Sequence, residues 1–397
     1  MTDMVPTPAD GSQRAARLFR WFLLGHLLVW TAIPTLTKPN PSLDMVEMVF
    51  LGHEWRINYP THPPLPNWIC EAVAVASRGG LWAQYLAAQI AMVLAFWAVW
   101  QLARQIVSAR AALFAVCLLE GCLFYTVSGD LLNNNVALFP CWAMAVLYFY
   151  RGIRAGRIRS WLGLGLWLGL GMMTKYTTVL LVATMLLFGL VNPEARKAWR
   201  RPGPYLAILL AGLIFLPHAW RLAAEDFTAV RYAASHLPPD KQWTGYLWNP
   251  LGFVVYQVGM LLPLLLAAMP LTGFPWRLRR VRGPERFSRD FLATMVLVPF
   301  AAQLAISAFG NVPLRGAWGS YLWMFAGLLL LVCLEVSPAA AAWRRAWIVW
   351  AATAAVVAAG AAVMHVAGPY FLSKDAHHFR HHFPGRLLAA KVDAAWA

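Results

Sequence analysis

The chain has 397 residues, of which 60% are hydrophobic and only 13% are charged. A typical soluble domain is about 45–50% apolar and about 25% charged, so the composition excludes a soluble enzyme, a secreted disulfide scaffold and a disordered protein. The net charge of +16 comes from short Lys and Arg clusters between apolar runs. That placement is typical of membrane topology, and we expect no nucleic-acid partner.

Eleven apolar segments predict an all-α polytopic membrane protein, since a spanning helix needs roughly 20 apolar residues. We interpret the first segment as an uncleaved anchor, because its apolar run is too long for a signal peptide. A tight outer turn at Lys175 separates the fifth segment from the sixth. The predicted spans are 18–37, 81–103, 111–128, 132–150, 160–174, 177–191, 204–220, 251–273, 290–309, 318–336 and 346–366.

The loops that hold 21 of the 33 Lys and Arg residues lie on one side of this topology, and the positive-inside rule makes that side cytoplasmic. The prediction is a cytoplasmic N-terminus over 1–17, a transmembrane module over 18–366 and a short outer tail over 367–397. Nine of the ten histidines and ten of the 17 acidic residues then fall on the outer side. We therefore expect the chemistry at the periplasmic face of the inner (plasma) membrane.

The first outer loop, about residues 38–80, begins with a predicted interfacial helix. Ser42 can cap a helix that starts at Leu43, and Asp44 and Glu47 then share one face of it. Apolar residues fill the rest of this helix, which is typical of a segment lying in the membrane interface. Two acids near its start would also complement the helix dipole without any catalytic role.

A proline-rich segment follows, and its four prolines over residues 59–66 exclude a helix there. Such a rigid segment can hold His62 in one place, as a binding site requires. A second short helix, over 65–78, then returns to the membrane. Tyr59, at the start of the rigid segment, is a candidate for positioning an acceptor.

These residues form a pattern that resembles a known family. Asp44 after the first span, Glu47 one turn later and the motif His62-Pro63-Pro64-Leu65 resemble the protein O-mannosyltransferase-like family of GT-C membrane glycosyltransferases, which includes the aminoarabinose transferases acting on lipid A. The resemblance covers roughly residues 15–190. It continues at Gly129-Asp130, at Asn133-Asn134-Asn135 and at the segment GLGMMTKY over 169–176.

The resemblance implies a GT-C bundle that transfers a sugar from a polyprenyl-phosphate donor on the extracytoplasmic face. It places the general base on Asp44, with Glu47 as the next candidate. In the aminoarabinose branch a Lys before Pro-Pro contacts the lipid phosphate, and an acid precedes that Lys. Here His62 and Thr61 stand at these positions, which argues against aminoarabinose as the sugar.

The residue chemistry agrees with this reading. A carboxylate can deprotonate an acceptor hydroxyl, cations can stabilise the departing phosphate, and a single displacement with one base inverts the anomeric carbon. Asp130 is a candidate for positioning the acceptor or for pairing with Lys175, and it is equally a candidate cap for the following helix. The candidate donor-phosphate ligands on the outer side are His62, Lys175, His218, Arg221 and Arg315.

Metal binding at the tail histidines is the weaker reading. His377, His378, His381 and His382 have a spacing that can bind a divalent metal, but no carboxylates accompany them and Arg380 opposes a cation. We therefore expect no metal and no other cofactor. Many relatives carry a soluble domain after the last span, and we expect it to be absent or truncated here.

The expected partners are a polyprenyl-phosphate sugar, membrane lipids and an envelope acceptor: lipopolysaccharide, another lipid or a protein. A lipid or glycan transporter (a flippase) is the alternative function, and an inactive scaffold is a third. Transport predicts polar residues in the middle of several spans, where Glu120 is the one clear candidate. A scaffold would not need Asp44, His62 and Lys175 to converge.

The topology can be tested by labelling single cysteines in intact cells, in a background without the five native cysteines. We expect a membrane-impermeant reagent to label positions in loop 38–80 and to miss positions in 151–159 and 276–289. Labelling of loop 38–80 only after permeabilisation would overturn this topology.

Overall fold

The computed structural model describes residues 8–235, 243–279, 284–368 and 385–396. The tail histidines at 377–382 lie outside these ranges. The long helices, in chain order, are α1 (Pro8–Thr37), α4 (Leu81–Ala103), α6 (Asn134–Ala155), α7 (Ile158–Thr174), α10 (Gly203–Ala224), α12 (Gly245–Thr272), α13 (Pro284–Gly310) and α15 (Ala340–Val366). The shorter ones are α2 (Leu43–Gly52), α3 (Leu65–Ala76), α5 (Ala109–Cys117), α8 (Thr178–Val191), α9 (Pro193–Ala198), α11 (Thr228–Ser235), α14 (Ala326–Cys333), α17 (Gly385–Trp396) and the 3-10 helices η1 (Leu118–Gly121) and η2 (Gly316–Phe325).

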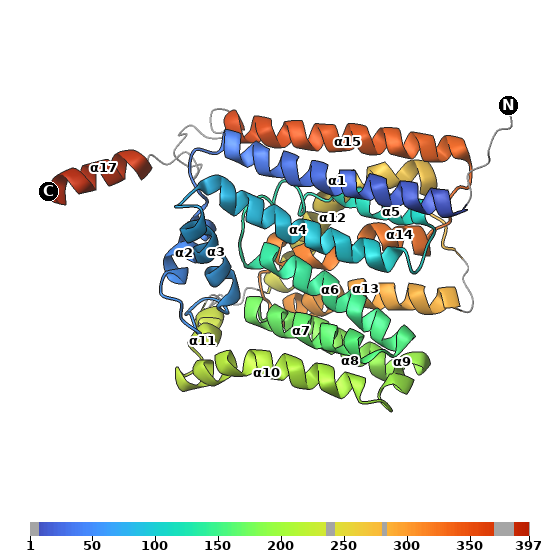
Figure 1. Ribbon diagram of the computed structural model, residues 1–397, viewed down its shortest axis with the longest axis horizontal. Coiled ribbons are helices and arrows are strands. Elements are labelled where there is room, and N and C mark those ends of the chain that lie inside the picture. Colours follow the sequence, from blue (N-terminus) through green and yellow to red (C-terminus); the bar gives the residue numbers. More distant parts are fainter. Residues whose placement is uncertain (1–7, 236–242, 280–283, 369–384, 397) are drawn as a thin grey trace.

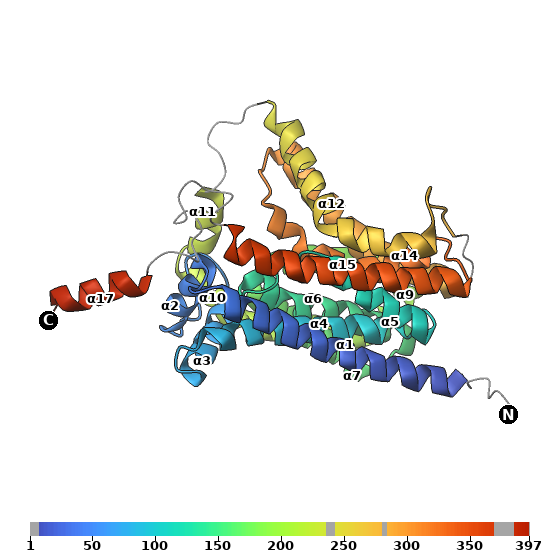
Figure 2. The same ribbon diagram turned by 90° about the horizontal axis from the view of Figure 1, so that it is seen from above.

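The helices lie side by side as a bundle, with α6 at its centre (Figure 1). Helix α6 packs against α4 on one side and α7 on the other, and α10 covers the far side of α7. Helices α1 and α15 pack on each other and close the opposite edge. Helix α12 contains three prolines, and its first part stands away from the bundle (Figure 2).

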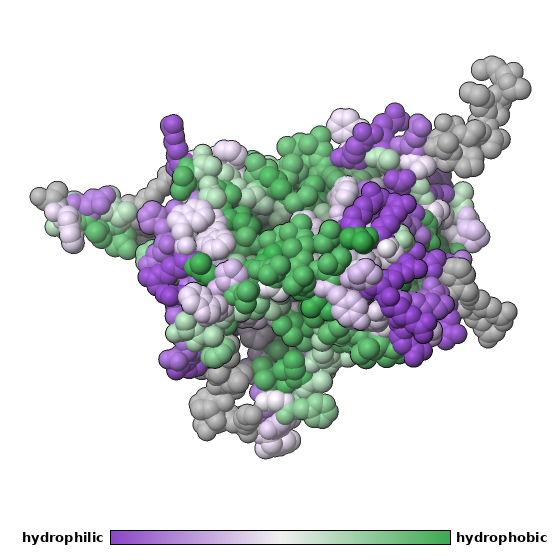
Figure 3. All heavy atoms as spheres, turned by 60° about the horizontal axis from the view of Figure 1, so that its bottom comes forward, coloured by the Kyte–Doolittle hydropathy of each residue, from purple (hydrophilic) through white to green (hydrophobic). Residues whose placement is uncertain are grey.

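The described elements are helices and the bundle has the surface of a membrane protein, which together confirm the predicted all-α membrane class. In the described part of the chain, eight helical segments are long and apolar enough to cross a bilayer, among them Gly316–Cys333 but not α7. An apolar band lies between hydrophilic ends (Figure 3). Within the described residues the β pairing is limited to one isolated bridge, between Leu278 and Leu334. The predicted segments at 111–128, 160–174 and 177–191 correspond to helices shorter than 18 residues, so the count of eleven spans stays a prediction.

The predicted continuous helix over 111–128 is wrong. The chain is helical through α5 and η1 and then runs on in turns to the start of α6. At Gly121 the backbone approaches α12 so closely that a Cβ there would lie 2.7 Å from the amide nitrogen of Leu264. Beyond it, the Leu123 amide donates to the carbonyl of Met260 in α12 (3.0 Å), so a neighbouring helix supplies the partner that a regular helix would have supplied.

Two short helices, α2 and α3, cover one end of the bundle (Figure 1). The sequence of the first outer loop predicted both. Helix α2 begins at Leu43, and the Ser42 hydroxyl accepts a hydrogen bond from the Met45 amide at 3.4 Å. Helix α3 begins at Leu65, directly after the proline-rich segment. Both boundaries confirm the predicted starts.

Glycines on α7 allow α10 to approach it closely. A Cβ at Gly165 would lie 2.6 Å from the Ala207 carbonyl oxygen of α10, and one at Gly169 would lie 2.8 Å from the Ile214 side chain. Backbones can approach this closely only where small residues stand at the contact, which is how membrane helices gain packing energy.

We expect Gly165→Leu to lower the thermal stability of the purified protein, because overpacking costs about 1–3 kcal/mol. Gly212→Leu on α10 is the matched control, since a Cβ at Gly212 meets no atom within 4 Å. Unfolding temperatures in one detergent compare the two variants with the wild type. Equal losses in both would contradict a specific contact between α7 and α10.

Candidate active site

The N-terminus of α6 organises the polar residues at the end of the bundle that α2 and α3 cover. Asn133 caps α6 there, since its side-chain oxygen accepts from the amides of Asn135 (3.0 Å) and Val136 (3.1 Å). The positive end of the α6 dipole therefore faces this region and favours negative charge.

Asp44 lies beside this helix end. Its carboxylate accepts a hydrogen bond from the Asn133 amide nitrogen (Nδ2 to Oδ2, 3.3 Å). The side chain is otherwise exposed, so the second carboxylate oxygen is open to a ligand. An accessible carboxylate, oriented by one amide and placed at a helix N-terminus, can accept a proton from a bound hydroxyl.

Lys175 lies in the turn between α7 and α8 and is 8% exposed. Its ammonium group donates to Asn135 Oδ1 (2.5 Å) and stands 5.8 Å from the centre of the Tyr321 ring. Within the described part of the chain, no carboxylate forms an ion pair with it. Burial lowers the pKa of Lys175 to about 7, so an anion bound beside it would restore the charge.

His62 lies within electrostatic range of both Lys175 and Asp44. Burial, followed by the nearby Lys175 charge, lowers the pKa of His62 to about 4, and Asp44 opposes that shift. The imidazole is therefore neutral near pH 7, and in that form it can donate one hydrogen bond. Asp44, His62 and Lys175 are the predicted residues that the fold brings together.

His218 contacts the loop that carries His62 directly, and Arg221 is linked to that loop through Glu225. His218 is fully buried; its Nδ1 donates to the Ile57 carbonyl (2.7 Å) and its Nε2 accepts from the Tyr176 hydroxyl (2.9 Å). Arg221 pairs with Glu225 at 2.7 Å. The other oxygen of Glu225 accepts from Asn58 Nδ2 in the same loop, at 2.6 Å. These bonds fasten the loop to α10 and α11, which fixes the position of His62.

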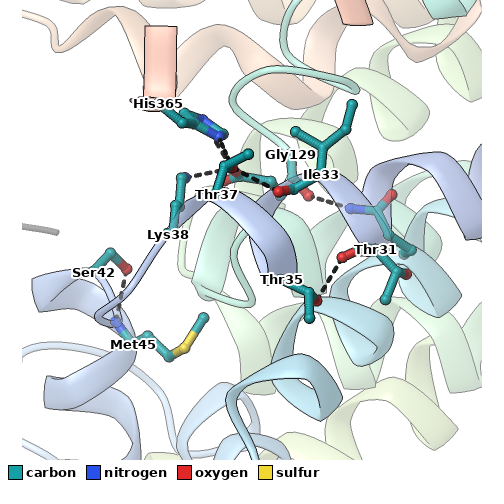
Figure 4. A network of polar contacts seen from close by, with 11 residues as sticks. Thr31, Ile33, Thr35, Thr37, Lys38, Ser42, Met45, Gly129 and His365 are labelled. Atoms are coloured by element: carbon teal, nitrogen blue, oxygen red, sulfur yellow. Dashed lines mark hydrogen bonds and ion pairs between the residues drawn. The ribbon is translucent and has the colours of Figure 1, made fainter. Parts of the chain in front are cut away.

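Asp130 does not pair with Lys175, as one predicted alternative had it, and it is not the cap of α6. Its buried carboxylate forms an ion pair with Lys38 at the end of α1, and His365 Nε2 lies 3.7 Å from it. His365 Nδ1 also contacts the Thr37 hydroxyl at 2.9 Å (Figure 4). Asp130 pairs with Lys38 and not with Lys175 because α1 and α15 end beside the loop that holds Asp130. Asp130 thus joins these helix ends.

The remaining predicted residues are Glu47, Tyr59 and Arg315. Glu47 accepts a weak hydrogen bond from Thr61, next to His62 (3.4 Å). Tyr59 is buried, and its hydroxyl accepts from the Arg56 amide (3.0 Å), so it stabilises the turn before the prolines. Arg315 is exposed just before η2, the helix that supplies the Tyr321 ring.

The sequence interpretation did not assign roles to Asn133, Asn135 and Asn58. Each links two elements far apart in the chain: α6 to Asp44, α6 to Lys175, and the His62 loop to Glu225. The run of three asparagines at a predicted helix start was the available signal for the first two. Among the described residues, no group of three or more His, Cys, Asp or Glu side chains is placed to hold a metal ion.

Comparison with known proteins agrees with the predicted resemblance. The family model of dolichyl-phosphate-mannose-protein mannosyltransferase matches residues 61–220, which include His62, Asp130 and Lys175. The crystal structure of ArnT from Cupriavidus metallidurans, bound to undecaprenyl phosphate, superposes with a TM-score of 0.61 at 16% sequence identity. The match covers 90% of this chain and 72% of ArnT. The chain therefore has the fold of the GT-C glycosyltransferases.

A curated relative extends the comparison. The lipopolysaccharide core galacturonosyltransferase RgtA of Rhizobium johnstonii is 27% identical over 326 residues, which cover 77% of this chain. The match covers 63% of RgtA, so the chain spans less than two thirds of that relative's length.

Proposed function

We propose that the protein is a glycosyltransferase that moves a sugar from a polyprenyl-phosphate donor to a hydroxyl group of an envelope acceptor. The observation that carries the proposal is the convergence of Asp44, His62 and Lys175 around the N-terminus of α6. The arrangement offers an open carboxylate, a neutral hydrogen-bond donor and a buried ammonium without an acidic partner. These are the groups that glycosyl transfer from a lipid phosphate requires.

In the proposed reaction Asp44 accepts the proton of the acceptor hydroxyl. The acceptor oxygen forms a bond to the anomeric carbon while the bond from that carbon to the phosphate oxygen breaks. The electron pair of the broken bond leaves with the polyprenyl phosphate, next to Lys175 and His62. One carboxylate acting as base gives a single displacement, so we propose inversion at the anomeric carbon.

The phosphate site follows from the surroundings of Lys175. An ammonium that is buried without a carboxylate gains most from an anion that enters its pocket, because a charge-assisted hydrogen bond is strong where water is excluded. ArnT, a solved structure with this fold, binds undecaprenyl phosphate, which supports a polyprenyl phosphate as the carrier. His218 and Arg221 act in this proposal by fixing the His62 loop.

For the acceptor we propose lipopolysaccharide, at the extracytoplasmic face of the inner membrane. RgtA acts on the lipopolysaccharide core, which supports this choice over a protein or another lipid. The distribution of Lys and Arg along the chain supports the orientation. The transporter alternative has less support, since the mid-span Glu120 is closed off by His26 (2.7 Å) and Trp30 (2.5 Å).

Asp44→Asn should lower the rate of sugar transfer about 100- to 10,000-fold, because the amide keeps the shape of the side chain and cannot accept the proton. The measurement is transfer of radiolabelled sugar in membranes that contain equal amounts of each variant. Glu47→Gln on the same helix is the matched control and should keep most of the activity. Near wild-type transfer by Asp44→Asn, with loss in Glu47→Gln, would move the base to Glu47.

The affinity for undecaprenyl phosphate should fall as the pH rises above about 7, since Lys175 then loses its proton in the empty site. One proton linked to binding weakens the affinity about tenfold for each pH unit above that pKa. In Lys175→Arg the charge persists, so this variant should keep its affinity over the pH range in which the wild type loses affinity. Both proteins bind the same phosphate, so the difference between their pH profiles excludes the titration of the phosphate itself. Identical profiles in both proteins would contradict the assigned role of Lys175.

A further inference from the structure

A second polar site lies at the opposite end of the bundle from Asp44 and Lys175. The end of α4, the end of α6 and the start of α7 surround a hollow of about 580 Å³. This volume is within the usual range of ligand sites, roughly 300–1,000 Å³. Its lining residues are Gln105, Tyr148, Arg151, Ala155, Arg157, Arg159 and Ser160.

Three arginines thus share this hollow, and no carboxylate of the described residues lines it. Arg151 is half-buried in the hollow, where the positive charge of Arg159 acts on it. Its own hydrogen bond goes to a neutral group, Gln101 Oε1, at 3.2 Å. Like charges held together without a counter-ion repel one another, and an anion in the hollow would remove that cost.

Three other arginines at this end of the bundle have acidic partners. Arg154, one turn after Arg151, pairs with Glu194 at 3.0 Å. Arg279 pairs with Glu285 at 3.2 Å, and Arg289 pairs with Asp290 at 2.8 Å. These three acids are therefore paired with arginines outside the hollow.

The neighbouring surface is suited to lipid. Ile158, Leu162 and Leu166 follow one another at four-residue spacing on α7, and each is more than 40% exposed. They form an apolar stripe along α7 that starts between Arg157 and Arg159. A lipid whose headgroup entered the hollow would find a surface for its acyl chains directly beside it.

We propose that this arginine hollow binds a phosphate group, either in the headgroup of an anionic phospholipid or as a free phosphate. Guanidinium groups match the geometry of phosphate oxygens and form paired hydrogen bonds with them. The hydroxyls of Tyr148 and Ser160 line the same hollow and can donate to the remaining oxygens. The site is separate from the proposed donor site and does not depend on the proposed activity.

The test measures binding of phosphatidylglycerol to the purified full-length chain in detergent by native mass spectrometry, with inorganic phosphate in a second arm. We expect Arg159→Gln to weaken binding about tenfold, as the loss of one charge-assisted contact does. Arg345→Gln, which removes an exposed charge outside the hollow, is the control and should bind like the wild type.

If Arg159→Gln does not fold, Arg157→Gln removes another arginine of the same hollow. An effect on phosphatidylglycerol alone assigns the site to a lipid headgroup, and an effect on both ligands assigns it to phosphate in general. Equal binding of both ligands by the wild type and by whichever of these two variants folds would overturn the proposal.

Discussion

Lipid cannot hydrogen-bond to a protein, so every polar backbone group within the membrane needs a partner from the chain itself. The segment after η1 meets this requirement by exchanging hydrogen bonds with other helices in both directions. Tyr125 donates to the Ser320 carbonyl (2.8 Å), and Gln89 donates to the Gly129 carbonyl (3.0 Å). This irregular segment leads directly to Asp130 and to the cap of α6, so the backbone partners supplied by other helices also set the position of the candidate site.

The same constraint explains why the site lies at one end of the bundle. Charged groups are costly at mid-membrane, and the fold collects Asp44, His62 and Lys175 where the helices end. Lys175 is the exception that points to a ligand, because it is buried next to an amide and an aromatic ring and has no acidic partner. A site that keeps an ammonium in this condition is suited to bind an anion and to release it again.

Local spacing was enough to predict α2, α3 and the rigid segment at His62, because capping and proline geometry act within a few residues. Hydropathy placed Asp44, His62 and Lys175 at the same membrane surface. It could not say which helices are neighbours, so the pairing of Asp130 with Lys38 and the bond from Lys175 to Asn135 were out of reach. Nor could composition reveal that the helix predicted over 111–128 ends after η1, since this end depends on the close approach of Gly121 to α12.

The buried contact between α1 and η1 has a consequence for biogenesis. Glu120 accepts hydrogen bonds from His26 and Trp30, two residues of α1, which is synthesised before η1. An acidic side chain that entered the bilayer alone would cost about 2.5 kcal/mol or more. Helix α1 therefore presents two hydrogen-bond donors to a segment that arrives roughly ninety residues later, and their bonds to Glu120 offset part of the cost of burying its carboxylate. In addition to its place in the finished bundle, α1 thus prepares a polar position for an acid that the bilayer would disfavour.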